Sequence, residues 1–230
     1  MDLDAIGRDR WNDAYVLSSN SSLWGDAPVP FAQTAVDDFS SHSARTILDL
    51  PCGDGRNLPP LADRFATVVG ADSSANAIQL SAARIKKTEL SNILLLESDI
   101  YATSFADGMF DGVFCCDMLG HLQRPANALR ELLRICRPGR HVMASIFALE
   151  DSIRRDDRMA RVGDREYIFD KRIYHHFYDE HAARSLCKDV DDAAELQSIQ
   201  LVRWMDPPHE GYREHEHLHA SWLVTLRKRD

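Results

Sequence analysis

The sequence lacks any apolar run that approaches the roughly 20 residues needed to cross a bilayer. Its first residues, MDLDAIGRDRW, have neither the basic start nor the apolar stretch of a secretory signal. Hydrophobic residues make up 44% and charged residues 27% of the 230 positions, which is ordinary for a globular protein. We therefore expect a cytoplasmic protein without a membrane partner.

Cysteine is scarce, and its spacing matches no metal-binding pattern. The count of five is odd, and no CxxC pair occurs. Both a disulfide framework and a cysteine-based metal site are therefore disfavoured. We expect buried free thiols in a reducing compartment. The five are Cys52, Cys115, Cys116, Cys136 and Cys187.

Excess positive charge is also missing, since the formal net charge is -9. An acidic protein does not attract polyphosphate by bulk electrostatics, so no nucleic-acid partner is expected. Basic residues recur near positions 154–172, where aspartates and glutamates interleave with them. This pattern favours a solvated face of mixed charge, with an anion-binding lid as the second interpretation.

The middle of the chain alternates short apolar runs with helical patterns. Runs that are apolar throughout and alternate with helices are typical of a parallel sheet covered on both faces. Right-handed crossovers then give a doubly wound α/β fold. Two later runs, joined by a turn-rich connection at 206–211, predict a hairpin whose final strand is antiparallel. The expected strands of this mostly parallel, seven-stranded sheet lie at 46–50, 67–71, 93–97, 112–116, 141–148, 196–204 and 217–227.

The length suits one domain, and no internal repeat divides it. We predict a single domain with three zones of different texture. Residues 1–42 form a helical cap, 43–148 the ligand-binding core, and 149–230 a substrate-side connector followed by the C-terminal hairpin. In such a fold the ligand lies beyond the carboxyl ends of the parallel strands.

Three features follow the first three predicted strands. The first strand runs into DLPCGDGRN at 49–57, where the GxG pair admits positive φ and lets a ligand approach the backbone. Asp72 ends the second strand, 17 residues after Gly55, and can accept hydrogen bonds from ribose hydroxyls. It could instead cap the helix that starts near Ser74. Asp99 follows the third strand as a possible acceptor for an adenine amino group, or as a turn residue.

Four ordered segments over about 44–148 resemble the class I S-adenosylmethionine-dependent methyltransferase superfamily. They are ILDLPCGDGRN, VVGADSS, SFADGMFDGVFCCDMLGHL and ELLRICRPGRHVMASIF. Two positions depart from the family pattern, because Pro51 and Arg140 stand where glycine is usual. Near the N-terminus, the segment around Trp24 and Gly25 is similar to the lead-in of small-molecule methyltransferases of the tellurite and thiopurine types.

The resemblance implies a Rossmann-like methyltransferase that uses S-adenosylmethionine and a small-molecule acceptor. The transfer would be an in-line displacement, in which the protein mainly holds donor and acceptor close and aligned. Trp24 would cover the cofactor, Asp49 and the backbone at 51–53 would hold its methionine end, and Asp72 its ribose. The residues expected to bind the cofactor are Trp24, Asp49, Pro51, Gly53, Gly55, Asn57, Asp72, Ser73, Asp99, Ile100, Cys116 and Asp117.

A nicotinamide cofactor fits the glycine turn less well. The GxGxxG pattern needs a third glycine where Leu58 stands. The carboxylate of Asp54 would also repel a pyrophosphate bound at the following helix. Two cationic centres in S-adenosylmethionine favour nearby carboxylates instead.

Histidines are the candidate general bases. His121 matches the His-Leu position of the family, although it could simply begin a helix. His217 and His219, with His215, alternate along the last strand, and their face is expected near the acceptor. The other interpretation is a plain polar sheet surface. Positions i and i+4 of one strand lie about 13 Å apart, so no metal site is expected.

Several alternatives remain open at this level. The same cofactor can support other chemistry, such as cyclisation, because a fold does not determine a reaction. A nucleic-acid methyltransferase is disfavoured by CCDM at 115–118, where an Asn/Asp-Pro-Pro-Tyr motif would be expected. A non-catalytic binding module is also conceivable. The acceptor atom and the oligomeric state do not follow from the sequence.

Overall fold

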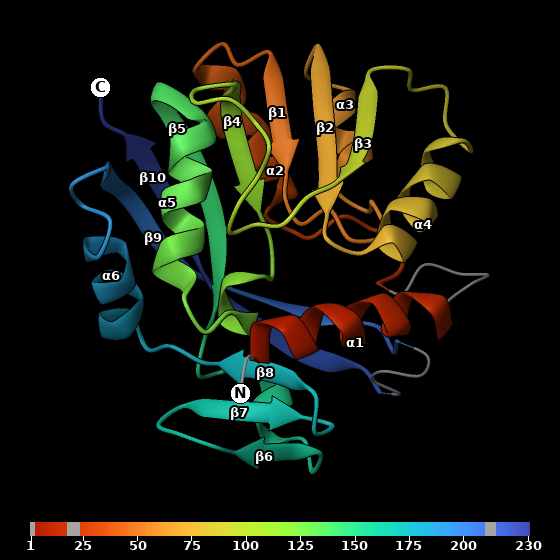
Figure 1. Cartoon of the computed structure of the whole chain (residues 1–230), viewed down its shortest axis with the longest axis vertical. Coiled ribbons are helices and arrows are strands. Elements are labelled where there is room, and N and C mark those ends of the chain that lie inside the picture. Colours follow the sequence, from red (N-terminus) through yellow and green to blue (C-terminus); the bar gives the residue numbers. More distant parts are fainter. Residues whose placement is uncertain (1–2, 18–23, 210–214) are drawn as a thin grey trace.

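The computed structural model describes residues 3–17, 24–209 and 215–230. A seven-stranded sheet forms its centre (Figure 1). The strands are β1 (Thr46–Asp49), β2 (Thr67–Asp72), β3 (Ile93–Glu97), β4 (Phe110–Cys115), β5 (Cys136–Phe147), β9 (Ala194–Asp206) and β10 (His217–Lys228), in the order β3-β2-β1-β4-β5-β10-β9. The pairs that β10 makes with β5 and β9 are antiparallel, and all other pairs in this sheet are parallel. The predicted doubly wound, mostly parallel fold with an antiparallel C-terminal strand is confirmed.

Helices cover both faces of this sheet. They are α1 (Leu3–Leu17), α2 (Ala32–Ser41), α3 (Leu58–Ala62), α4 (Ala75–Ile85), α5 (Pro125–Ile135) and α6 (Glu180–Lys188). Adjacent residues of a strand point to opposite faces, so Ile47 packs with α2 and α3 while Leu48 packs with α5. Both side chains are fully buried. Of the helices in the described residues, none is long and apolar enough to cross a membrane.

A second, three-stranded sheet was not predicted. It contains β6 (Met159–Arg161), β7 (Glu166–Phe169) and β8 (Ile173–His176), and it lies with α1 below the carboxyl ends of the parallel strands (Figure 1). Strands of three or four residues in a charged segment give no clear alternation, which explains the omission. Arg158 pairs with Asp156 and Arg161 with Asp164, so the mixed-charge interpretation of this segment is confirmed.

One strand boundary differs from the prediction. The strand expected to begin at residue 141 begins at Cys136, directly after α5 ends at Ile135. The Lys228 ammonium donates to the carbonyl oxygens of Arg134 and Cys136 at 3.0 and 2.8 Å. These bonds satisfy groups that the helix end leaves exposed and stabilise the early start of the strand. All five cysteines are buried and free, as predicted.

Candidate functional site

A cavity of about 280 Å³ lies beyond the carboxyl ends of β1 to β4. Its other walls come from α1, from β8 and from the short helical turns η1 (Leu119–His121) and η2 (Ser152–Arg155). Twelve of the predicted site residues line it: Trp24, Pro51, Gly53, Asn57, Asp72, Ser73, Asp99, Ile100, Cys116, Asp117, His121 and His219. Asp49, Gly55 and His217 do not line the cavity, although each lies next to residues that do.

The glycine turn after β1 brings the backbone to the cavity surface. Gly53 has φ +55°, and a Cβ atom there would lie 2.9 Å from Tyr15 Oη and 3.7 Å from Trp24 Nε1. Gly55 has φ +84°, but its missing side chain faces Ser81 on α4 at 2.8 Å. Gly53 therefore leaves room on the cavity side, whereas Gly55 lets the turn pack on the helix behind it.

Asp72 is joined to this turn by hydrogen bonds. Its carboxylate accepts from the backbone N–H of Gly53 at 3.0 Å and of Ser74 at 2.9 Å. Burial raises the pKa of Asp72 to about 6, against the lowering effect of these bonds. Ser74 caps α4 by accepting from Ala77 N at 3.1 Å. Asp72 therefore does not have the alternative role of helix cap, and each of its oxygens retains a lone pair for a ligand.

Asp99 and Ile100 lie at the far end of the cavity, after β3. Asp99 Oδ1 accepts from the backbone N–H of Tyr101 at 2.9 Å, so the turn interaction considered for this residue is present. Ile100 is buried and lines the same wall. The neighbouring Ser98 hydroxyl is buried without a hydrogen-bond partner. A buried hydroxyl in that state is suited to pair with a bound polar ligand.

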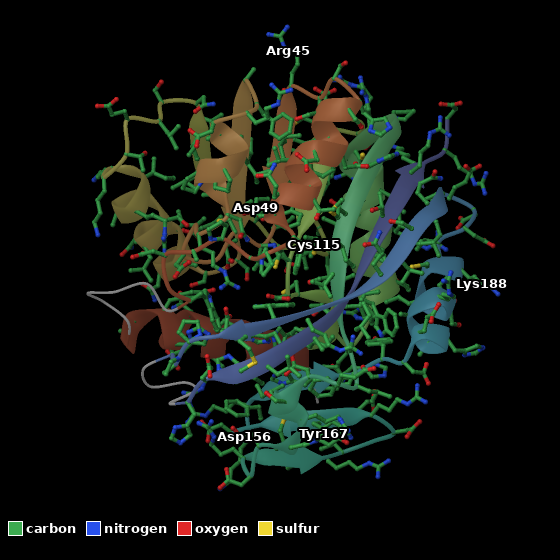
Figure 2. All side chains as sticks on the ribbon, turned by 180° about the vertical axis from the view of Figure 1, so that it is seen from behind. Arg45, Asp49, Cys115, Asp156, Tyr167 and Lys188 are labelled. Atoms are coloured by element: carbon green, nitrogen blue, oxygen red, sulfur yellow. The ribbon has the colours of Figure 1, made fainter. Side chains whose placement is uncertain are left out.

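Asp49 comes just before the glycine turn in the chain, at the lower end of β1 in Figure 2. The side chain is 0% exposed, and neither carboxylate oxygen has a hydrogen-bond partner. Burial raises its pKa well above the ordinary value, and the nearby Asp72 raises it further. A buried carboxylate without donors is costly unless a cation approaches. Asp49 therefore does not contact the cavity itself, and a cation bound nearby would favour its ionised form.

The end of β4 supplies a third acidic group. Asp117 has φ +50°, which Asp tolerates better than most residues, and its backbone N–H donates to Ser145 Oγ at 2.7 Å. Arg56 approaches the Asp117 carboxylate at 3.7 Å. Cys116 beside it is buried, and burial raises the pKa of its thiol. In this wall the Cys116 thiol is therefore neutral, and the Asp117 carboxylate pairs with Arg56.

The N-terminal segment covers the glycine turn. Trp24 Nε1 donates to Tyr15 Oη at 3.1 Å, and the Trp24 backbone N–H donates to Asp54 at 3.2 Å. The rings of Trp11 and Trp24 lie 5.7 Å apart. Trp24 thus occupies the covering position that the sequence suggested, with two further aromatic residues behind it.

The candidate bases differ in their surroundings. His121 Nδ1 lies 2.9 Å from the Tyr174 carbonyl oxygen, and burial lowers the pKa of His121 to about 4. His219 Nδ1 lies 3.0 Å from the Asp151 carboxylate. His217 is buried beside His219 but outside the cavity wall, while His215 is exposed. Only His121 and His219 of the predicted bases therefore reach the cavity.

Sequence reasoning missed several residues of the cavity wall. Asp151 follows β5 at the same edge as Asp72 and Asp99, so the rule that found those acids would also have found it. Arg56 sits inside the first motif, but nothing in its spacing indicated burial. Others include Tyr101, Arg124, Phe147 and Ile153.

Residues 48–144 match a family model described as a methyltransferase domain. Among curated proteins, a ubiquinone biosynthesis O-methyltransferase of Pseudomonas paraeruginosa is 32% identical over 119 residues, which are 50% of each chain. The chain thus spans about half the length of the curated relatives it matches. The residues matched by the family model run from β1 through most of β5.

Solved structures match over a greater length at lower identity. One is a Burkholderia thailandensis 1,6-didemethyltoxoflavin N1-methyltransferase with bound S-adenosylhomocysteine, with TM-score 0.68 and 17% identity, covering 99% of this chain and 89% of that one. Another is a [4+2]-cyclase with TM-score 0.68 and 14% identity, covering 100% and 97%. At these identities the likeness shows the fold alone.

Proposed function

We propose that this chain, whose residues 48–144 form a class I S-adenosylmethionine-dependent methyltransferase domain, transfers a methyl group to a small-molecule acceptor. The domain match and the methyltransferase relatives agree with the cofactor predicted from sequence. One observation carries the proposal for this chain. The glycine turn and the acids that follow β2 and β3, namely Gly53, Asp72 and Asp99, come to a single cavity.

The residues present fit the cofactor. Five carboxylates line the cavity, and that of Asp49 is buried next to it; the five are Asp54, Asp72, Asp99, Asp117 and Asp151. They suit a ligand with an ammonium and a sulfonium, because opposite charges attract strongly where water is partly excluded. The absence of a side chain at Gly53 lets Tyr15 and Trp24 lie close to the turn and leaves its backbone at the cavity surface. When bound, the cofactor supplies an already activated methyl group.

The chain's own residues then act by holding and orienting. Asp72 would bind the ribose, and Asp99 with Ile100 the adenine, while Asp49 and the 51–53 backbone would hold the methionine end. Placing the acceptor atom in line with the methyl group is worth roughly 7–11 kcal/mol in well-oriented reactions. Trp24 and α1 would exclude water from this arrangement.

The other half of the cavity suits an acceptor with an aromatic body. Its walls include Phe147, Ile153, Tyr174 and His175. Aromatic walls favour flat, apolar molecules through offset or edge contacts. The P. paraeruginosa relative is named as an O-methyltransferase, which supports a hydroxyl acceptor. We therefore propose a small hydroxylated aromatic compound as the acceptor class.

His121 is the residue proposed to accept a hydrogen bond from the acceptor hydroxyl and to orient it. Because the Tyr174 carbonyl can only accept, His121 Nδ1 carries the proton and Nε2 keeps a lone pair. The lowered pKa, about 4, keeps this ring neutral at physiological pH. A neutral imidazole accepts a hydrogen bond from a hydroxyl and orients it, which is the first requirement for proton removal.

Product analysis tests the proposed function. The protein is incubated with methyl-labelled S-adenosylmethionine and a panel of hydroxylated aromatic compounds, and products are separated by mass. The proposal expects S-adenosylhomocysteine together with a product heavier by one methyl group. Release of methylthioadenosine without any acceptor would instead favour a reaction of the cofactor itself, such as cyclisation.

Cofactor affinity should fall in acid because of Asp72. Ribose hydroxyls donate to the carboxylate, so binding requires the ionised form. With a pKa of about 6, roughly one tenth of the side chain is ionised at pH 5. Calorimetry should therefore show S-adenosylhomocysteine binding about tenfold weaker at pH 5 than at pH 7.5. Asp72→Asn should flatten this dependence, and an unchanged slope in that variant would contradict the assignment.

Asp49→Asn should raise stability relative to the wild type at high pH and should weaken ligand binding. Since the raised pKa means that folding disfavours the ionised carboxylate, this group costs more stability as pH rises. The melting temperature of the variant should gain on that of the wild type between pH 5 and pH 8. Its affinity for S-adenosylhomocysteine should fall about tenfold, because a nearby negative charge is lost. Equal affinity, or a gap in melting temperature that does not change with pH, would be inconsistent with this role.

A further inference from the structure

Four side chains with possible metal-ligand atoms meet at the end of the β9–β10 hairpin where the two strands are connected. Asp206 ends β9 and is the register partner of His217, the first residue of β10. His219 lies two residues further and projects from the same face of the strand. His209 comes from the connection that follows β9. One ligand atom of each lies within 4.8 Å of every other.

Three of the six separations between the ligand atoms are close to those of a tetrahedral ligand set. His217 Nε2 and His219 Nε2 lie 3.1 Å apart. Asp206 Oδ2 lies 3.5 Å from His209 Nε2 and 3.5 Å from His219 Nε2. With metal–ligand bonds of 2.0–2.1 Å, a tetrahedral zinc ion places its ligands roughly 3.4 Å from one another.

The contact between His217 and His219 requires a positive charge between their Nε2 atoms. His217 Nδ1 lies 2.8 Å from the His215 carbonyl oxygen, and His219 Nδ1 lies 3.0 Å from the Asp151 carboxylate. Because both partners only accept, both Nδ1 atoms carry protons and both neutral rings direct Nε2 lone pairs at each other. Either a shared proton or a metal ion must lie between them. Carboxylate and carbonyl partners on Nδ1 are the usual supports of metal-binding histidines.

The other two members of the cluster each have a buried ligand atom without a short hydrogen bond. His209 is 2% exposed, and its Nε2 atom lies 3.5 Å from Asp206 Oδ2. Asp206 Oδ2 is also buried, and Arg56 approaches it at 3.6 Å. Two polar atoms held only by these longer ion-pair contacts have lost water without gaining a close partner. A single bound cation would satisfy both at once.

The net charge around the cluster is negative and favours a divalent cation. Arg56 is the guanidinium in contact with Asp206, and it also pairs with Asp117. Asp151 supports His219 from the other side. Three carboxylates thus face one guanidinium, so the neighbourhood has an excess of two negative charges. A divalent cation balances that excess, whereas a shared proton balances half of it.

We propose that Asp206, His209, His217 and His219 bind one divalent transition-metal ion such as Zn²⁺. Four protein ligands complete a tetrahedral shell, which is the pattern of a structural site rather than of one that binds substrate. The ion would fasten the hairpin end to the cavity, because His219 and Asp151 line the cavity and His209 packs on Trp24 at 5.3 Å. His217 and His219 then serve as ligands and not as bases.

The residues of this site explain why the sequence predicted no metal site. The distance along one strand excludes a set drawn from His215 and His219 alone. The actual set takes residues i and i+2 from β10 and adds Asp206 through the strand register and His209 through the connecting segment. The proposal does not depend on the methyltransferase assignment, since it rests on the ligand geometry.

Metal binding is tested on chelator-treated full-length protein. Titration with Zn²⁺ should give one equivalent bound tightly, and saturation at about 100 times the Kd should raise the melting temperature by about 5–10 °C. X-ray absorption of the loaded protein should show nitrogen and oxygen ligands at about 2.0–2.1 Å, with imidazole scattering. His209→Ala and His217→Ala should each weaken binding by more than about 100-fold. Asp151→Asn should weaken it by about 10–100-fold.

A second cluster in the described residues provides the control. Asp38, His42 and His141 also bring ligand atoms within 4.8 Å, at the opposite end of the sheet. There His141 bonds the Asp38 carboxylate and His42 bonds the Asp38 carbonyl, each at 2.8 Å. His42→Ala should therefore leave the bound equivalent unchanged. Circular dichroism of each variant checks folding without using the metal or the cofactor.

Three results would overturn the proposal. The first is the absence of any Zn²⁺ binding by the chelator-treated protein, which would leave the shared proton as the cation between the histidines. The second is equal Zn²⁺ affinity in the wild type and in His209→Ala. The third is loss of the bound equivalent in His42→Ala alone, which would place the ion at the other cluster.

Discussion

Asp72→Ala should reduce the affinity for S-adenosylhomocysteine at least about 100-fold. The variant loses an acceptor for two ribose hydroxyls, and a hydrogen bond to a charged group is worth about 1.5–3 kcal/mol. Two such bonds amount to about 3 kcal/mol or more, which corresponds to a factor above 100 in Kd. The Gly53 and Ser74 backbone N–H groups also lose their partner, so the glycine turn itself loosens. Isothermal titration calorimetry measures the change directly.

Glu97→Ala is the matched control for this result. Glu97 ends β3, is the register partner of Asp72, and is exposed outside the cavity wall. Its removal subtracts the same formal charge from the same edge of the sheet, and the affinity should stay within about threefold of wild type. If Asp72→Ala bound the ligand as well as Glu97→Ala does, the ribose assignment would be wrong.

Gly53→Ala should have the second largest effect on binding. Alanine at φ +55° costs roughly 1–2 kcal/mol. Its Cβ would also press on Tyr15 Oη at 2.9 Å, where the hydroxyl already holds Trp24. Overpacking of this kind costs about 1–3 kcal/mol, so we expect affinity for S-adenosylhomocysteine to fall about 30-fold or more. Fluorescence of Trp24 should shift in the same variant, because its ring loses the Tyr15 contact.

Gly108→Ala separates backbone strain from the contact at the cavity. Gly108 has φ +63°, and a Cβ atom there would meet Pro138 at an ordinary 3.6 Å. Both variants should therefore lose some thermal stability, while Gly53→Ala alone loses ligand affinity. Equal affinities in the two variants would mean that no ligand approaches Gly53.

The sequence was most informative where local pattern decides structure. The apolar runs around Leu48 and Val69 predict buried parallel strands because such strands have two covered faces. Once the strands are known, their carboxyl ends must meet at one edge, so Asp72 and Asp99 come together. The site residues that line the cavity lie at those ends for this reason.

The sequence was least informative where distant segments pack together. Asp49 lies one residue before Leu50, the first cavity-lining residue after β1, so its side chain is buried and does not line the cavity. The small sheet forms from strands too short to show a period. The cluster around His209 depends on how β9 pairs with β10 and on where the connection folds, and neither follows from residue spacing.

A crystal structure of the complex with S-adenosylhomocysteine tests the central claim most directly. The account predicts the ribose hydroxyls on the Asp72 carboxylate, the adenine against Ile100, and the methionine end over Gly53. The sulfur atom should face the half of the cavity that contains His121. A ligand bound elsewhere on the protein, with Asp72 and Gly53 untouched, would contradict the account.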